Sequence, residues 1–421
     1  MEENSSGKIK REEWWSWGAG THGQLGTGAF HDELTPQSLH PPSGSRLVHL
    51  ACGGSHAVAV FGNGEAMTWG NNSSGQLGHG DLQNRCEPRL VRELQWLKIK
   101  TAAAGWSHSA FISDDQKLFT FGSGGYGQLG HGDLDSCNIP RQVICFTSMK
   151  VCHVACGMRH TLALVESEEG TEVYAFGASR KGQLGIELSE RERPDKGFLG
   201  NNCNVYPSLV GSLIGYNIVS IHANGDHSAA LTDYGGLYVW GRGFDSTNNI
   251  TLPLRVSNQL NFSQVALGWN HLMALTYDGQ VYATGRSQKS GALNGLAISG
   301  GVCVEKSGQR LQKSQLSFLL HLYEPLKGCN VRWIAAGAEH SAVILGDGSV
   351  LTWGWGEHGQ LGLGTTTDQS HPMVLDVPRR KDPRIYCGSG FSFLCQSCEN
   401  LCEFSLEGKI RKDSFETNLS S

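Results

Sequence analysis

The chain has 421 residues, of which 56 are glycine and only 12 are proline, and its formal net charge is −5. This glycine content argues against a mostly helical protein, and the mild negative charge gives no general reason to expect nucleic acid as a partner. No apolar run approaches the ~18 residues of a membrane span, and the polar start lacks the apolar stretch of a secretion signal. Thirteen cysteines, an odd number, predict reduced thiols in a cytoplasmic or nuclear protein.

The first expected elements are a short polar tail, residues 1–13, and a strand at 14–17. The tail has only three basic residues against four acidic ones, too few for an arm that neutralises phosphates. The strand ends in an aromatic residue followed by glycine, and this pair recurs along the chain. The copies are Trp17-Gly18, Trp69-Gly70, Phe121-Gly122, Phe176-Gly177, Trp240-Gly241 and Trp353-Gly354, with a degenerate Thr284-Gly285.

A second signal, a small residue followed by Gly-x-x-His, keeps a fixed distance from the first. His56 precedes Trp69 by 13 positions (69 − 56), and four further units share this distance. Alternating apolar residues around an Asn-Gly or Asp-Gly pair, as at Asn63-Gly64 and Asp347-Gly348, predict a β-hairpin within the unit. Repeated all-β units of about 50 residues, each unable to bury its own faces, predict radially packed sheets.

The count of units reaches seven only if the two ends of the chain share one. Cys387-Gly388 opens a unit near the C-terminus, and strand 14–17 is the second half of a hairpin with no first half before it. Joining them closes the ring and removes the open sheet edges. A strand at 401–404 is the alternative, but it lacks the glycine and the following turn. We therefore predict an all-β, seven-bladed β-propeller over 14–396, closed by the N-terminal strand, with a C-terminal tail at 397–421.

The motif Gly-Gln-Leu-Gly-x-Gly follows the aromatic pair at 23–28, 75–80, 127–132 and 359–364, with a truncated copy at 182–185. Together with the small-Gly-x-x-His element, it resembles the regulator of chromosome condensation repeat over 14–396. The resemblance implies a seven-bladed propeller. It also implies one of three roles: nucleotide exchange on a small GTPase, UV-B reception in plants, or binding modules attached to ubiquitin ligases. Since the chain ends soon after the propeller, no ligase domain is expected. The copies at 241–244 and 291–295 lack the clean motif, so rebuilt loops are expected there.

Three motifs that suggest chemistry have structural interpretations that we favour. The Gly-Gln-Leu-Gly copies precede proline-containing loops rather than a helix, so we interpret them as turns and not as phosphate loops. The recurrent histidines, one per blade, do not form a compact metal site and are expected to bond neighbouring backbone groups. Cys387, Cys395, Cys398 and Cys402 have zinc-like spacing, but we interpret them as thiols of a terminal strand and tail. No metal, cofactor or catalytic residue is predicted, and the protein is not expected to be an enzyme.

The two residues between the glycine and the histidine of the small-Gly-x-x-His element vary from unit to unit, whereas the element around them recurs. One pair per blade should surround the axis on one face and form a partner-binding ring. The proposed members of this ring are Trp106, Met158, Arg159, Asp226, Trp269, Asn270 and Glu339. Two tryptophans, a methionine and an arginine have the composition of a protein-binding hot spot. Simple packing of each tryptophan on the adjacent blade is an alternative that the sequence leaves open.

The longest insertion, residues 286–332, is a second candidate for binding a partner. Its basic residues exceed its acidic ones, and those selected as candidates are Arg286, Lys289, Lys306, Arg310 and Lys313. Loops of this length are functional or disordered, and the sequence leaves both open.

The favoured function is a non-catalytic protein-interaction propeller with a regulatory or scaffold role. The alternative is guanine-nucleotide exchange on a Ran-like small GTPase, with the 286–332 loop disturbing the phosphate and magnesium site. UV-B reception is a remote alternative, because the resemblance would ask for Gly-Trp-Arg-His-Thr in neighbouring blades. Trp106 and Trp269 belong to the second and fifth units, and we expect their rings to lie too far apart to couple. The oligomeric state is left open.

Overall fold

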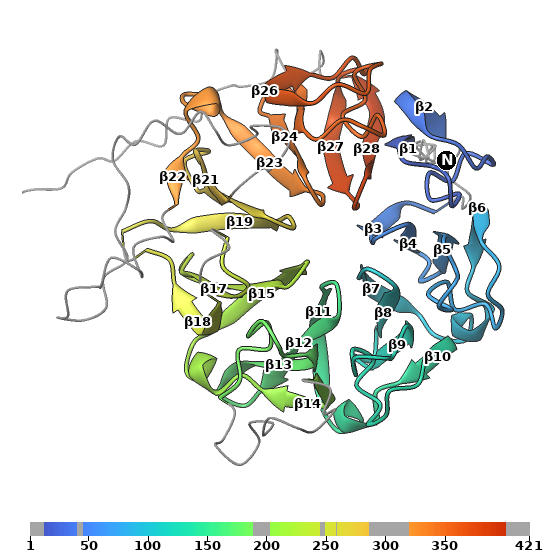
Figure 1. Ribbon diagram of the computed structural model, residues 1–421, viewed down its shortest axis with the longest axis vertical. Helices are drawn as coiled ribbons and strands as arrows, with labels where there is room; N and C mark the ends of the chain where they lie inside the picture. The colour runs from blue at the N-terminus through green and yellow to red at the C-terminus, as the bar shows by residue number, and fades with distance from the viewer. Residues whose placement is uncertain are drawn as a thin grey trace, which may run out of the picture.

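Seven four-stranded antiparallel sheets stand around a central axis in the computed structural model of the chain (Figure 1). The structure describes residues 12–39, 45–187, 203–244, 249–257, 259–285 and 320–400. Each sheet is one blade, numbered here in chain order of its innermost strand. The innermost strands are β3 (Leu47–Cys52), β7 (Ile99–Ala104), β11 (Lys150–Cys156), β15 (Ile218–Asn224), β19 (Phe262–Leu267), β23 (Val331–Ala336) and β27 (Arg380–Cys387). The predicted seven-bladed propeller is confirmed.

The second strand of each blade is the most apolar, because both of its faces pack against neighbouring blades. In β4 (His56–Phe61) and β20 (His271–Thr276), for example, every residue is buried. The other second strands are β8 (His108–Ser113), β12 (His160–Ser167), β16 (His227–Thr232), β24 (His340–Leu345) and β28 (Phe391–Asn400). The third strands of blades 1–6, each carrying the aromatic–glycine pair or its degenerate copy, are β5 (Ala66–Gly70), β9 (Leu118–Gly122), β13 (Gly170–Ala178), β17 (Leu237–Gly241), β21 (Val281–Gly285) and β25 (Val350–Gly354).

The outer strands are less buried, and short 3-10 turns follow several of them. These strands are β6 (Arg85–Leu90), β10 (Cys137–Gln142), β14 (Cys203–Leu209), β18 (Ile250–Arg255), β22 (His321–Leu322) and β26 (Gln369–Val374). The 3-10 turns are η1 (Arg92–Leu94), η2 (Ile144–Phe146), η3 (Gly211–Leu213) and η4 (Glu324–Leu326), and each buries one apolar residue. Among the described residues, no helix is long and apolar enough to cross a membrane.

The two ends of the chain build blade 7 together. Strand β1 (Glu12–Gly18) lies between β28 and β2 (Glu33–Leu39), in the order β2-β1-β28-β27. The register pairs Trp14 with Cys395 and Trp17 with Ser392. The predicted closure by the N-terminal strand is therefore confirmed. The N-terminal segment also supplies the outer strand β2, which the sequence analysis did not include, and the alternative strand at 401–404 lies outside the described residues.

Main-chain hydrogen bonds tie the turn of one blade to the turn of the next around the axis. Six such N–H to carbonyl bonds, between 2.8 and 3.3 Å, are Gly54 to Gly105, Trp106 to Gly157, Met158 to Gly225, Trp269 to Ala338, Ala338 to Ser389 and Ser389 to Gly53. The blade 4–5 seam differs because Asn224 replaces the repeated glycine. There the Asn224 side-chain amide donates to the Leu267 carbonyl at 2.7 Å instead. These ties hold the turns in a fixed ring.

The recurrent histidines join adjacent blades through side-chain hydroxyls, not mainly through backbone groups as we had expected. His56 Nε2 bonds Ser109 Oγ of the next blade at 2.9 Å, and that hydroxyl donates to the Gln76 carbonyl at 2.7 Å. The same kind of pair recurs at His108–Thr161, His160–Ser228, His271–Ser341 and His340–Ser392. His227 alone bonds a carbonyl, that of Trp269, since the next blade has Leu272 in place of the hydroxyl.

Gly105 makes the first prediction, because it leaves no room for a side chain. A Cβ there would lie 2.3 Å from His108 Cε1 and 2.6 Å from the Gly157 carbonyl oxygen. We expect Gly105→Ala to lower the free energy of unfolding by about 1–3 kcal/mol through overpacking. Gly125→Ala is the matched control, since nothing lies within 4 Å of its added Cβ. Equal urea midpoints for the two variants would contradict the packing argument.

Candidate functional site: the ring face

The ring face is the side of the propeller on which the first and second strands of every blade are joined. The loops after the third strands lie on this side too, because successive antiparallel strands reverse direction. Six of these loops are anchored by an N–H that donates to the carbonyl just before the recurrent histidine or Phe391, at 2.8–2.9 Å. The anchors are Ala19 to Gly390, Asn71 to Ser55, Ser123 to Ser107, Ala178 to Arg159, Arg242 to Asp226 and Trp355 to Glu339.

The Gly-Gln-Leu-Gly motif forms the seam between blades, which confirms its interpretation as a turn. Gly75, Gly78 and Gly80 all have positive φ angles, which favour glycine. The glutamine carbonyl of this turn faces the aromatic residue of the next blade: Trp69 Nε1 donates to the Gln24 carbonyl at 2.9 Å. Trp240 and Trp17 make the same bond, to the carbonyls of Gln183 and Gln360.

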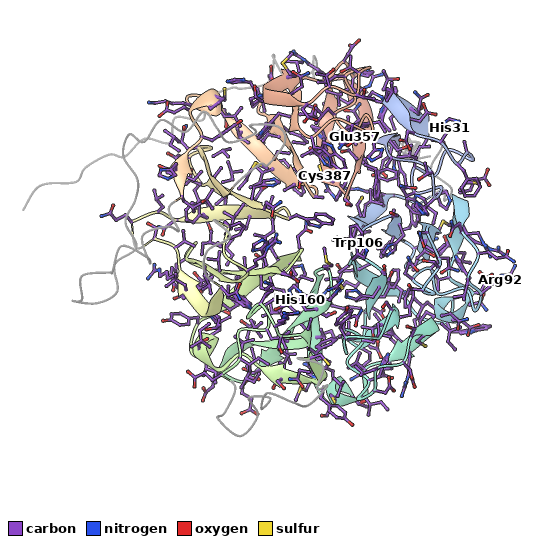
Figure 2. The ribbon with its side chains drawn as sticks, in the orientation of Figure 1. His31, Arg92, Trp106, His160, Glu357 and Cys387 are labelled. Atoms are coloured by element: carbon purple, nitrogen blue, oxygen red, sulfur yellow. The ribbon has the colours of Figure 1, made fainter. Side chains whose placement is uncertain are left out.

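Trp106 and Trp269 meet at the centre of the ring face. Their ring centroids are 5.0 Å apart, with an interplanar angle of 45°, and Figure 2 places Trp106 close to the axis. Trp106 comes from blade 2 and Trp269 from blade 5, so the pair spans the axis. Each ring also leans on a glycine of the preceding blade, Gly54 and Gly225 respectively. Trp106 remains 39% exposed, which leaves aromatic surface available for contact.

This geometry corrects one expectation from the sequence and refines another. The expectation that rings from the second and fifth blades lie too far apart to couple is wrong, because both side chains point to the axis of a closed ring. Packing on the adjacent blade, the alternative left open above, does occur. It accounts for only part of the Trp106 indole, which keeps an exposed face.

A polar network fixes the ring members of blades 4 to 6. The Arg242 guanidinium donates to the Trp269 carbonyl and, at 2.7 Å, to Asn270 Oδ1. Asn270 in turn donates to Glu339 Oε1 at 3.3 Å. Separately, Gln183 donates to Asp226 Oδ1 at 3.3 Å. These bonds hold the backbone around Trp269 and orient the acidic side chains.

The ring members of blade 3 lie next to the same centre. The Met158 N–H donates to the Gly225 carbonyl at 2.8 Å, beside Trp269. The exposed Arg159 guanidinium stands 4.5 Å above the centre of the Tyr126 ring, a cation–π contact. The structure thus brings Trp106 and Trp269 together, joins Asn270 to Glu339, and places Arg159 over a residue of the neighbouring blade.

Sequence reasoning missed Tyr126, Arg242 and Trp355, which also contribute to the ring face. All three lie in loops after the third strand, within a few residues of the aromatic–glycine pair. These positions vary from unit to unit beside a recurring aromatic–glycine pair. The variation that identified the ring positions could therefore have identified them too. The candidate residues of the long insertion, Arg286, Lys289, Lys306, Arg310 and Lys313, lie outside the described residues.

The C-terminal cysteines belong to blade 7 as far as the structure describes them. Cys395 lies buried in β28, and burial raises its pKa; burial likewise raises the pKa of Cys387, to about 12. Cys402 lies outside the described residues. Within the described ranges, no group of three or more His, Cys, Asp or Glu residues is placed to hold a metal ion.

Comparisons with known proteins agree with this architecture. The model of the family described as RCC1-like domain matches residues 13–394. The chain is 35% identical to the ultraviolet-B receptor UVR8 of Arabidopsis thaliana, over 85% of this chain and 75% of the receptor. It is 30% identical to the secretion-regulating guanine nucleotide exchange factor of Mus musculus, over 90% of this chain and 83% of that protein.

Solved structures share the fold at lower identity. Human WBSCR16 superposes with a TM-score of 0.72 at 21% identity, covering 93% of this chain and all of that one. Prp20p of Saccharomyces cerevisiae, described with its binding to Gsp1p and histones, gives a TM-score of 0.72 at 21% identity. That match covers 94% of this chain and 93% of Prp20p.

Proposed function

Because the chain belongs to the RCC1-like family of propellers, we propose that it is a non-catalytic protein-interaction module whose ring face binds a partner. The observation that carries the proposal is the Trp106–Trp269 pair at the centre of that face. Hot spots of protein interfaces are rich in tryptophan, tyrosine and arginine near the centre of the contact. The ring face is also rigid, because main-chain hydrogen bonds between blades already fix its turns. Little conformational entropy is therefore lost when a partner binds.

The test compares the partners that the full chain captures from an extract. We expect Trp106→Ala with Trp269→Ala to lose a partner that the unmodified chain retains, with a weakening of about 30-fold or more. Trp96→Ala is the matched control, because Trp96 is 83% exposed but lies after η1, on the side away from the ring face. The same partners captured equally by all three proteins would contradict the proposal.

Guanine-nucleotide exchange is the second candidate, supported by the similarity to the secretion-regulating exchange factor. Exchange needs no proton-transfer residue. An exchange factor binds the nucleotide-free GTPase best, so its binding weakens the binding of the nucleotide, and the nucleotide weakens the binding of the factor. The experiment is release of a fluorescent GDP from Ran-like and other Ras-type GTPases. Acceleration with one of them supports this function, while no acceleration across the panel rejects it and leaves the interaction module.

UV-B reception is the remaining alternative, and the close tryptophan pair supports it. Against it, Trp106 is followed by Ser107 and Trp269 by Asn270, so neither has the arginine of the Gly-Trp-Arg-His-Thr pattern. A change of molar mass on UV-B irradiation, followed by light scattering, would support reception, and an unchanged mass would reject it.

We further propose a cytoplasmic or nuclear location. The ten cysteines whose side chains the structure describes are free, as reduced thiols are in those compartments. Fluorescence microscopy of the tagged full chain tests this.

A further inference from the structure

Charged side chains of both signs surround the Trp106–Trp269 pair on the ring face. Blade 3 contributes three cations: Arg159 from the turn, and Arg180 and Lys181 from the loop after β13. Blade 6 contributes the acidic residues Glu339 and Glu357. Blade 4 contributes one residue of each sign, Asp226 and Arg242. The Trp106–Trp269 pair spans the axis from blade 2 to blade 5, with blades 3 and 4 on one side of it and blade 6 on the other.

The acidic side chains have hydrogen-bond donors on the protein, whereas the cations of blade 3 have no acidic partner among the described residues. Gln183 donates to Asp226, Asn270 to Glu339, and the Trp355 indole to Glu357 at 3.1 Å. Among the residues that the structure describes, no Asp or Glu forms an ion pair with Arg159 or Arg180. Arg159 instead rests on the π face of Tyr126, which positions the guanidinium without a carboxylate from the described residues.

The cations are joined to the aromatic centre through short main-chain paths. The Trp106 N–H donates to the Gly157 carbonyl, two residues before Arg159. The Ala178 N–H donates to the Arg159 carbonyl at 2.8 Å, two residues before Arg180. The cations of blade 3 therefore lie on loops that directly adjoin the turn carrying Trp106.

We propose that the ring face binds an acidic segment of a protein partner, with an apolar side chain on Trp106 and Trp269 and a carboxylate at Arg159. This inference rests on the proposed interaction function and names the chemistry of its partner. A planar guanidinium on an aromatic ring is well suited to a carboxylate, because it can donate two parallel hydrogen bonds. Across the pair, the blade 6 carboxylates of Glu339 and Glu357 already accept hydrogen bonds and disfavour the opposite orientation of the segment.

The experiment selects peptides from a random 12-residue phage library on the immobilised full chain, with binders to the Trp106→Ala, Trp269→Ala protein removed. We expect the remaining peptides to combine aspartate or glutamate with a large apolar residue. Arg159→Glu should weaken them by about tenfold or more, since a charge-assisted hydrogen bond is lost and repulsion replaces it. Their affinity should also fall with added salt.

Arg92→Glu is the matched control, with the same change of charge at an exposed position of η1 (Figure 2). Its affinity for the selected peptides should stay within about twofold of the unmodified chain. Neutral or basic peptides, or equal effects of the two charge reversals, would overturn the acidic-segment inference and leave the interaction function standing. If no selected peptide depends on Trp106 and Trp269, the acidic-segment inference and the proposed interaction function both fail. A dimer in light scattering that Arg159→Glu dissociates would make a second copy the occupant and overturn the inference.

Discussion

Deletion of residues 1–18 is expected to make the protein aggregate, whereas deletion of 1–11 is expected to be nearly neutral. The longer deletion removes β1, which pairs with both β2 and β28. It therefore leaves β2 without its sheet and β28 with an open edge, a template for association between chains.

The deletion also removes two core side chains, Trp14 and Trp17, which are 1% and 0% exposed. Truncation of a buried tryptophan costs about 3–5 kcal/mol, so losing two approaches the whole stability of a typical domain. Trp17 additionally donates to the Gln360 carbonyl of blade 6 at 2.9 Å, and that bond joins two blades. Soluble yield and thermal unfolding of the two truncated proteins measure the effect. Cooperative melting of the 1–18 deletion at the temperature of the full chain would contradict closure by β1.

Stability is expected to fall steeply as the pH drops from about 6.5 towards 4. Burial lowers the pKa of His56, His160 and His340 to about 3, and that of His108, His227 and His271 to about 4. An unfolded histidine titrates near 6.5. Below that pH the unfolded chain binds more protons than the folded one, so acid favours unfolding.

The hydrogen bonds of the buried histidines show why protonation of these side chains is unfavourable in the folded state. Nε2 of His56 donates to Ser109, whose own proton goes to Gln76, so the neutral ring leaves Nδ1 without a proton. That Nδ1 is buried and has no partner in the described structure, and protonation would create a buried donor with no acceptor. Each histidine contributes up to about 1.4 kcal/mol per pH unit to the slope, and six together can remove the stability of a typical domain within about two units.

Urea unfolding at pH 7.5, 6.5, 5.5 and 4.5 measures the slope. The chain supplies its own control, since the blade 7–1 seam has Phe391 and Ala57 where five of the other six seams have histidine and a hydroxyl residue. His340→Phe with Ser392→Ala copies that seam and should reduce proton uptake on unfolding by about one. The Gln360 carbonyl keeps its bond from Trp17 in this variant. A free energy of unfolding that does not change between pH 7.5 and 4.5 would contradict the lowered pKa of the buried histidines.

The sequence by itself determined the repeat, the number of blades and the closure of the ring. It did so because these features depend on local signals that recur in register: glycines at positive φ in turns, alternating apolar strands, and a half hairpin at each end. Gly64, for instance, adopts φ +86 in the hairpin turn that Asn63-Gly64 predicted. The ring positions were also identified, because their variation stands out against an invariant frame.

Only the tertiary structure decided which of these residues meet. Trp106 and Trp269 are separated by 163 positions (269 − 106), and their contact depends on the diameter of the closed ring, which no local pattern encodes. The hydroxyl partner of each histidine likewise depends on how one blade registers against the next, and so does the aromatic support under Arg159. Spacing along the chain specifies a blade, whereas contacts between blades arise from packing rigid units around an axis, and the candidate site consists of such contacts.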